Sequence, residues 1–406
     1  MNEKQLLASL ARSNAGRDPD RLRIKYSRMA ADKSAFFRCT AGLFYELLPR
    51  DPLLQHAPLA WITADLHLEN FGSYLGDNAL AYFDLNDFDE AALAPATYEC
   101  VRTLAHLAIV APTLGIAARS LRAESRLALD EFVRALARGK SHWVERRLAV
   151  GAVKKLLRQA ADRKQRELLD QRTYLHRRKR QLLLDSKRAL PLLPGTRTAV
   201  ERRVKQAINA LGDRVKVSGD FEILDVARRI AGAGSLGLER YVVLLRGNGK
   251  PNGARLLDLK FANPSCLAVQ FRQFQPQWKS EATRIVSLQR RLQAESPALL
   301  CASIESDKSF VLKELQPAQD RLQLADLSTD PARRHTALAT MMRLSAWSML
   351  RASGWDGAAP GQLLTAFAAE PQWQQRMLTV SAQMAEVMTN AWEAFRRTNA
   401  ERKLLA

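Results

Sequence analysis

The chain has 406 residues, 47% of them hydrophobic and 26% charged, which is the composition of a globular protein large enough for two lobes. It has a formal net charge of +20, no apolar run that could span a bilayer and no apolar core of a signal peptide near its start, so we expect a cytoplasmic protein without a membrane span. Its four cysteines are far apart and form no Cys-x-x-Cys pair, which argues against a zinc site or a disulfide framework and predicts four free thiols.

The first 60 residues are predicted to be helical, with a break at Pro49–Pro52. In Ser34–Leu48 apolar residues recur at three- and four-residue spacing, which indicates a helix that faces the core. Two strand-like segments follow, Leu59–Asp65 and Ala79–Leu85, and both lead into acidic residues.

Residues 98–210 have a helical pattern with few strand signals, and they carry a concentrated positive charge. Between Arg138 and Arg188, seventeen Lys or Arg stand against five Asp or Glu. Solvated helix faces are the simplest interpretation. An acidic or phosphorylated substrate is an alternative partner, and so is a nucleic acid, which we do not favour because no RNA-binding signature with interleaved aromatics is present.

The pattern changes to strands and glycine-rich turns at Phe221–Ala262, with a hairpin connection at Asn248–Gly253. A helix from about Trp278 to Gln293 follows, then two further strands, ALLCASI and SFVLKEL, and a helical C-terminal part. We therefore expect an α+β protein in three segments. These are a helical segment at 1–215, a β-rich lobe at 216–318, and C-terminal helices at 319–406 that complete the helical lobe.

Two early motifs place carboxylates at the ends of strands. WITADLHLENFG puts Asp65, His67 and Asn70 directly after an apolar strand, and AYFDLNDFDEA then supplies Asp84 and Asp87. An Asp that meets a substrate hydroxyl, an Asn on the same loop and a strand-end acid for magnesium form a phosphotransfer arrangement. Each motif alone is equally compatible with a loop cap or a solvated turn, but their order and spacing together favour chemistry.

The motif AGAGSLGLERYVVLL places Gly232, Gly234, Ser235 and Gly237 between two apolar strands. In a dinucleotide-binding fold a helix begins at such a motif, whereas the β-branched YVVLL indicates a strand. A hairpin of strand, glycine loop and strand can cover nucleotide phosphates with its backbone amides, and the Ser235 hydroxyl would add a donor.

Lys260 lies inside the apolar strand LLDLKFA, where lysine is rare. It resembles the strand lysine of protein kinases, which contacts the α- and β-phosphates; the alternative is an edge-strand lysine that faces water. In kinases the next helix supplies a Glu that orients this lysine, and here Glu281 is the candidate, or Gln289 through a hydrogen bond. In the same arrangement, Glu314 and Leu315 after SFVLKEL would lie beside the nucleotide base, unless the strand simply ends at the following proline.

These motifs resemble those of the protein-kinase-like superfamily. ADLHLEN is similar to the H-G-D-L-H-x-x-N loop of aminoglycoside and choline kinases, and NDFDEA is similar to the metal-binding I-D-F-x-x-A that follows it. GAGSLG and LDLK resemble the glycine loop and the strand lysine of the same fold. Over most of residues 20–350 the chain also resembles an uncharacterised bacterial family, domain of unknown function 2252.

The resemblance implies a two-lobed protein-kinase-like fold with a small antiparallel β lobe and a large helical lobe. It implies Asp65 as the base, Asn70 and Asp87 as magnesium ligands, and Lys260 on the phosphates of ATP. We also predict His67 and Asn70 to be catalytic and Asp84 to be a further magnesium ligand. Because the catalytic loop precedes the glycine loop, we expect a circular permutation of that fold. Thr63 stands where the kinases have the His of this loop, so the usual internal brace of the loop is missing.

We therefore expect an ATP- and magnesium-dependent phosphotransferase that acts on a hydroxyl of an unidentified small molecule or protein. Nucleotidyl transfer uses similar parts and stays open. The alternatives are a nucleotide-binding pseudokinase, a basic nucleic-acid-binding adaptor, and a metal-dependent hydrolase that would need further histidine ligands.

Overall fold

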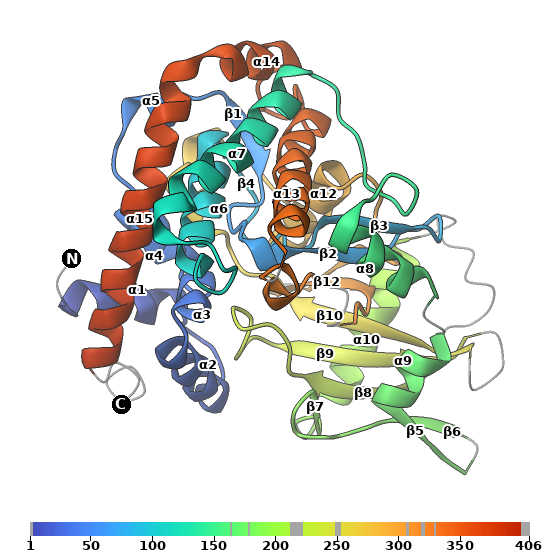
Figure 1. Ribbon diagram of the computed structural model, residues 1–406. Helices are drawn as coiled ribbons and strands as arrows, with labels where there is room; N and C mark the ends of the chain where they lie inside the picture. Colours follow the sequence, from blue (N-terminus) through green and yellow to red (C-terminus); the bar gives the residue numbers. More distant parts are fainter. Residues whose placement is uncertain are drawn as a thin grey trace.

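The computed structural model describes residues 3–162, 165–177, 179–211, 222–247, 253–305, 308–317, 321–328 and 330–398. It has the expected mixed α+β composition, with a helical part beside an antiparallel sheet (Figure 1). The four cysteines are free thiols, as predicted. Within the described ranges, no helix combines the length and the apolarity needed to cross a bilayer. Most of the predicted hairpin connection, residues 248–252, lies outside these ranges.

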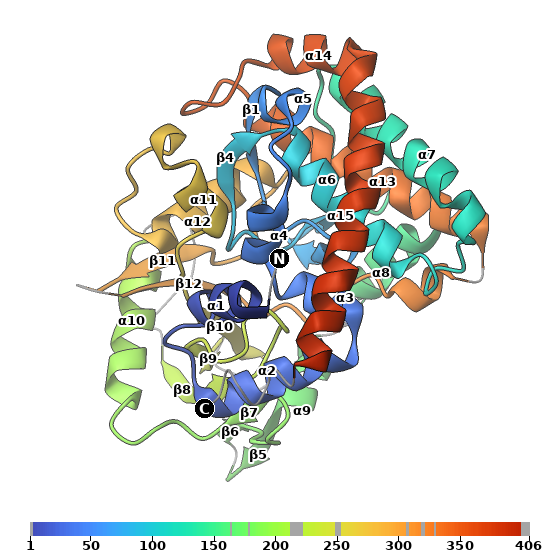
Figure 2. The same cartoon turned by 90° about the vertical axis from the view of Figure 1, so that its left-hand side faces the viewer.

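The helical part is built from both ends of the chain (Figures 1 and 2). Its N-terminal helices are α1 (Glu3–Ser13), α2 (Pro19–Ala31), α3 (Lys33–Arg38), α4 (Ala41–Leu47), α5 (Pro52–Gln55), α6 (Thr97–Val110) and α7 (Ala118–Ala137). Its C-terminal helices are α13 (Pro331–Arg351), α14 (Gly361–Ala369) and α15 (Pro371–Arg397). Because α15 packs on α6 and α13 packs on α7, the two ends of the chain share one apolar core.

The apolar pattern of Ser34–Leu48 forms two helices, α3 and α4, rather than the single helix that we predicted. Thr40 lies between them with non-helical backbone angles, and its hydroxyl donates to the Phe36 carbonyl oxygen at 2.7 Å. Asp32 begins α3 by accepting hydrogen bonds from the backbone N–H groups of Ser34 and Ala35. The phenylalanines of both helices remain buried, so the core-facing role of the segment is confirmed.

The main sheet is antiparallel and has the strand order β11-β12-β10-β9-β8-β7. Its strands are β7 (Ala189–Leu190), β8 (Ile223–Arg229), β9 (Arg240–Leu245), β10 (Arg255–Phe261), β11 (Cys301–Ile304) and β12 (Ser309–Glu314). Leu257 and Leu259 of β10 join the apolar core on the face covered by α10 (Arg197–Asn209). Asp258 and Lys260 alternate with them and face the opposite way, as the two-residue period of a strand requires. Helix α12 (Glu281–Leu292) connects β10 to β11 and packs on β11 and β12.

Two small sheets carry the early motifs. The first pairs β1 (Leu59–Ile62) with β4 (Ala92–Pro95), and the second pairs β2 (Phe71–Leu75) with β3 (Ala81–Leu85). The chain leaves β1 into the Asp65 loop, passes through the short helix η1 (Leu68–Asn70), and leaves β3 into the Asp87 loop. The backbone N–H of Asn86 donates to the Asn70 carbonyl oxygen at 2.9 Å, so the two loops are adjacent.

The region predicted as helical between residues 98 and 210 contains strands as well as α8 (Gly151–Asp162) and α9 (Gln165–Arg172). A hairpin of β5 (Thr173–His176) and β6 (Lys179–Leu182) follows α9. The buried Arg180 side chain of β6 donates to Thr173 Oγ1 of β5 at 2.8 Å and to the Asp170 carboxylate of α9 at 2.8 Å. The Leu182 N–H donates to the Asp225 carboxylate of β8, so tertiary contacts overrode the local helical pattern. Further short helices in the described ranges are α11 (Cys266–Gln270), η4 (Arg272–Phe274) and η6 (Leu324–Leu327).

Candidate functional site

The register of the main sheet places charged side chains side by side on one face. Lys260 of β10 lies opposite Arg240 of β9, and Arg229 ends the neighbouring strand β8. Asp258 lies two residues from Lys260 and forms ion pairs with Arg229 at 2.6 Å and with Arg240 at 2.5 Å. Lys313 of β12 lies directly opposite Asp258. The like charges of Lys260 and Arg240 lie directly opposite each other, which is unfavourable in a sheet, whereas Asp258 has partners of opposite charge around it.

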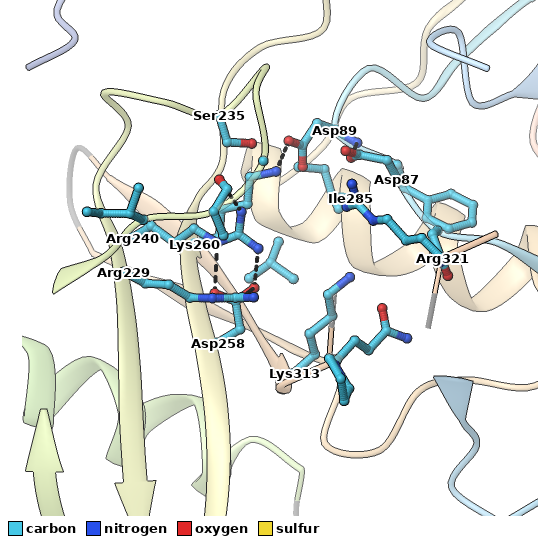
Figure 3. A pocket seen from close by; sticks show the side chains of 18 of the residues that line it. Asp87, Asp89, Arg229, Ser235, Arg240, Asp258, Lys260, Ile285, Lys313 and Arg321 are labelled. Atoms are coloured by element: carbon cyan, nitrogen blue, oxygen red, sulfur yellow. Dashed lines mark hydrogen bonds and ion pairs between the residues drawn. The ribbon is translucent and has the colours of Figure 1, made fainter. Parts of the chain in front are cut away.

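A cavity of about 250 Å³ separates this face of the sheet from the Asp87 loop, and we call it the cation cavity (Figure 3). Asp87 and Asp89 lie on one side of it, and Arg229, Arg240 and Lys260 lie on the other. Among the described residues, its lining has three acids, Asp87, Asp89 and Asp258, and seven cations, Arg172, Arg188, Arg229, Arg240, Lys260, Lys313 and Arg321. The excess of positive charge favours an anionic ligand.

Lys260 forms an ion pair with Asp89, which is 171 positions away in the sequence. Glu281, which we predicted to orient this lysine, instead forms an ion pair with Arg284 at 2.6 Å in the first turn of α12. Gln289 lines the cation cavity but donates to Gln293 at 3.1 Å. The acid that orients Lys260 therefore comes from the early motif NDFDEA and not from the helix after the lysine strand.

Asp87 and its neighbour Asn86 offer oxygen atoms to the cation cavity. Burial opposes ionisation of Asp87, but the charges of Lys260, Lys313 and Arg321 prevail and lower its pKa. The Asn86 Oδ1 is buried and accepts no hydrogen bond from any described residue. Magnesium uses few protein oxygens and keeps several waters, so these two groups fit it.

The other predicted magnesium ligands are engaged elsewhere. The Asn70 side chain donates to the Asp65 carbonyl oxygen at 2.8 Å and is not part of the cavity lining. Asp84 is 1% exposed, accepts from the backbone N–H of Leu85 and forms an ion pair with Arg351 at 3.2 Å. No cluster of three His, Cys, Asp or Glu that could hold a metal ion occurs in the described ranges.

A second cavity of about 490 Å³, which we call the Asp65 cavity, lies beside the first. Asp87, Asp89 and Ser235 line both cavities, so the two adjoin at these residues. Its other charged side chains in the described part of the chain are Asp65, Glu46, Glu90, Arg12, Arg17, Lys25 and Arg38. The structure thus places Asp65, Asp87, the glycine motif and Lys260 around two adjoining cavities.

Helix α6 braces the Asp65 loop. Arg102 donates to the Asp65 carboxylate from Nε at 2.9 Å and from Nη2 at 2.5 Å. One turn earlier, the Glu99 carboxylate accepts hydrogen bonds from the Thr63 N–H, the Thr63 hydroxyl and the Ala64 N–H, each at 3.0 Å. These two side chains therefore hold the Asp65 loop from one face of α6. Their sequence signal was a Glu and an Arg three residues apart in the apolar segment ECVRTLAHLAIV, which we missed.

The Asp65 loop has a strained backbone at Ala64 and a raised pKa at Asp65. Ala64 has a positive φ of 60°, a strained conformation for a residue other than glycine. Burial raises the pKa of Asp65 to about 7, although the Arg102 guanidinium opposes this shift. A carboxylate with a pKa near neutrality is well matched to proton transfer.

His67 lies outside the lining of both cavities, although we predicted it to be catalytic. Its ring is 5% exposed, packs on His106 and accepts a hydrogen bond at Nδ1 from the Glu69 N–H. Burial lowers its pKa well below the usual value, so the ring is neutral. Its position supports the loop rather than the reacting groups.

The glycine motif bridges the two cavities. Gly232 lines the cation cavity, Gly234 lines the Asp65 cavity, and Ser235 lines both. Gly237 has a φ of 88°, and a Cβ atom there would lie 2.8 Å from the Arg17 Cβ. The Arg17 guanidinium donates to the carbonyl oxygens of Gly234 and Leu236, so the connection between α1 and α2 holds this loop.

A third, apolar cavity of about 140 Å³ adjoins the cation cavity through Gln316 and Pro317. Glu314 and Leu315 line it, together with Tyr74, Leu168, Leu169 and Leu256. The Glu314 and Leu315 N–H groups already donate to the carbonyl oxygens of Ala298 and Leu256, so neither is free to recognise a ligand. The Gln316 Nε2 is buried and has no hydrogen-bond partner among the described residues.

Comparison with known protein families gives a match that covers most of the chain. The family model described as "Uncharacterized protein conserved in bacteria (DUF2252)" matches residues 17–398. No curated protein and no solved structure matches the chain. The predicted family resemblance is confirmed over nearly the whole chain.

Proposed function

The chain belongs to a bacterial family of uncharacterised proteins, and we propose from its own cavities that it is a nucleotide-dependent, kinase-like phosphotransferase. One observation carries this proposal. Lys260 and the acids Asp87 and Asp89, which are far apart in the sequence, line one cavity beside the glycine motif, and Lys260 pairs with Asp89 there. A lysine for phosphates opposite an acid for magnesium is the arrangement that phosphoryl transfer uses.

The cation cavity would hold the phosphates of ATP. Lys260 and Arg240 supply positive charge from the sheet, and the backbone near Gly232 and the Ser235 hydroxyl cover the cavity from above. Asp87 and the Asn86 Oδ1 would hold magnesium, which neutralises charge on the transferred group when it is bound. Asp89 keeps Lys260 directed into the cavity.

The apolar cavity would hold the base. Leu256 and Leu315 supply apolar contact, and the unpartnered Gln316 amide supplies a hydrogen-bond donor. The order of elements also supports the proposal: a glycine loop between β8 and β9, Lys260 on β10, then α12 and the strands β11 and β12. This is the order expected for the nucleotide-binding lobe of a kinase-like fold. The joint helical lobe of the two chain ends is what a circular permutation predicts.

Asp65 would act on the acceptor from the adjoining cavity. Its carboxylate accepts the proton of the acceptor hydroxyl as that oxygen bonds to the terminal phosphorus, and the bond to the leaving ADP breaks. Arg102 and Glu99 keep Asp65 in place during this step. The mixed charge of the Asp65 cavity is compatible with a small-molecule or a protein hydroxyl.

Nucleotide binding can be tested by thermal unfolding with ATP and magnesium. We expect the wild type to gain about 2.7 kcal/mol at a nucleotide concentration one hundred times its Kd, because a ligand of the folded state stabilises it by mass action. Lys260→Met and Asp87→Asn should lose most of this gain. Lys308→Met is the matched control, since Lys308 lies outside the cavity and pairs with Glu239. An unchanged wild-type melting temperature at millimolar nucleotide would exclude the proposed function.

Catalysis can be tested by release of phosphate from ATP, with water as the acceptor. Asp65→Asn should keep the nucleotide-dependent gain in stability but lower the rate by about 10²- to 10⁴-fold, the usual contribution of a general base. The rate should rise with pH and level off above about 7, where Asp65 is ionised. Binding combined with a rate that Asp65→Asn leaves unchanged would favour a pseudokinase instead.

A further inference from the structure

Three arginines gather at the β7 side of the cation cavity, and the proposed site for ATP does not use them. Arg172 ends α9, Arg188 precedes β7, and Arg229 ends β8. All three line the cation cavity. They come from three separate segments, so their convergence is a product of the tertiary fold.

Hydrogen bonds of the backbone fix the positions of these arginines. The Arg172 carbonyl oxygen accepts from the Leu183 N–H at 2.9 Å, and the Arg188 carbonyl oxygen accepts from the Ile230 N–H at 2.8 Å. The Asp185 carboxylate accepts from the N–H groups of residues 187, 188 and 189, which orders the turn that carries Arg188. These contacts therefore hold the backbone that carries Arg172 and Arg188 in place.

The acids nearby do not neutralise this cluster. Asp258 serves both Arg229 and Arg240, and the carboxylate of Asp185 is 4.0 Å from the Arg188 Nε, the limit of an ion pair. The Arg172 Nε is buried and has no hydrogen-bond partner among the described residues. Burial lowers the pKa of Arg172, and the charge of Arg188 lowers it further. A buried N–H donor without a partner is costly unless a ligand accepts a hydrogen bond from it.

The position of Arg172 relates the cluster to the proposed base cavity. Leu168 and Leu169 of α9 line the apolar cavity, and Arg172 lies about one helical turn further along the same helix in the cation cavity. Lys260 reaches Asp89 at the side of that cavity where Asp87 lies (Figure 3). A ligand that spans both cavities would pass Lys260 at one point and the arginine cluster at another.

We propose that Arg172, Arg188 and Arg229 form a second phosphate-binding subsite, which takes a phosphate group that Lys260 does not contact. Arginine suits this role because its guanidinium group binds phosphate oxygens in pairs. Two phosphates of a nucleotide could supply the group: the terminal phosphate of the 5′ chain, or a further phosphate on the ribose. The nucleotide part of this inference rests on the proposed function, whereas the anion subsite itself does not.

The subsite can be tested by titration calorimetry with AMP, ADP, ATP and adenosine 3′,5′-bisphosphate at fixed salt. The variants are Arg172→Gln and Arg188→Gln, and the control is Arg166→Gln, an exposed arginine of the same helix. If the subsite takes the terminal phosphate, both variants bind ATP about 10-fold more weakly and AMP unchanged. If it takes a ribose phosphate, ATP and AMP are unchanged and the bisphosphate loses about 10-fold.

Binding of inorganic pyrophosphate tests the anion subsite independently of the proposed nucleotide. Lys260→Met should still bind pyrophosphate, and adding Arg172→Gln should weaken that binding about 10-fold. Such a result without any binding of ATP to the wild type would exclude the proposed nucleotide and keep the anion subsite. Because the Arg188 side chain is 52% exposed, its variant should melt at the temperature of the Arg166→Gln control. Equal affinities of both variants and the control for every probe would overturn the subsite.

Discussion

The cation cavity has two opposite sides that are built on different principles. The sheet side presents Arg229, Arg240, Asp258 and Lys260 from regular antiparallel strands. The loop side presents irregular backbone, in which the Asp87 loop lies beside the Asp65 loop. On the sheet side, alternation and register place each charge. On the loop side, Glu99 and Arg102 of α6 hold the Asp65 segment by hydrogen bonds across more than 30 residues of sequence.

On the sheet side, different residues stabilise the fold and line the cavity, whereas on the loop side the same residues do both. Along β10, Leu257 and Leu259 belong to the apolar core, while Asp258 and Lys260 belong to the cavity. Neighbouring residues of one strand therefore have distinct roles. On the loop side the same buried groups that hold the fold also set the chemistry of Asp65, so the two roles cannot be separated as cleanly.

The largest expected effect tests whether core residues and cavity residues of β10 have separate roles. Leu259 is fully buried, so Leu259→Ala should lower the free energy of unfolding by about 3 kcal/mol through lost burial and a residual cavity. Lys260→Met should change it by less than about 1 kcal/mol, because its partner Asp89 remains 29% exposed to water. Denaturant unfolding of both variants measures these values. A loss of similar size in Lys260→Met would show that the cavity face also carries the stability of the sheet.

A smaller effect, dependent on pH, tests the loop side. Burial raises the pKa of Glu99 from its ordinary value of 4.5 to about 7, against the hydrogen bonds from Thr63 and Ala64. Between these two values the folded protein keeps a proton that the unfolded chain releases, so the contribution of Glu99 to stability falls as the pH rises. The contribution is complete below pH 4.5 and is lost as the pH passes through about 7.

Glu99→Gln removes this titration. Relative to the wild type, the variant should gain on the order of 2 kcal/mol in unfolding free energy between pH 5 and pH 8. Asp65 also has a raised pKa, but it is present in both proteins and its titration cancels in the comparison. Denaturant unfolding at the two pH values measures the difference. A constant difference across this range would mean that Glu99 does not titrate there.

The same contrast explains how much the sequence could predict. Lys260 was predicted because a lysine in an apolar strand is conspicuous, and the strands β8, β9, β10 and β12 followed from their composition. The orienting role of Asp89 and the brace from Glu99 and Arg102 were missed, because they depend on which distant segments meet. A local sequence pattern predicts which side chains of a strand share a face, but it does not predict which distant segment contacts a loop. The hairpin after α9 was missed for the same reason, since its contacts with β8 stabilise it.

The smallest expected effect concerns the strain in the Asp65 loop. Ala64 is fully buried with a φ of 60°, and glycine adopts that conformation without steric cost. Ala64→Gly should therefore raise the free energy of unfolding by up to about 1 kcal/mol, or leave it unchanged where the added freedom of the unfolded chain offsets the relief. Ala96 is the matched control: it is equally buried, but its φ of −53° is ordinary, so Ala96→Gly should cost about 1 kcal/mol. Equal losses in the two variants, measured by denaturant unfolding, would show that the Glu99 brace holds Ala64 without strain, and the loop side would then differ from the sheet side in its partners alone.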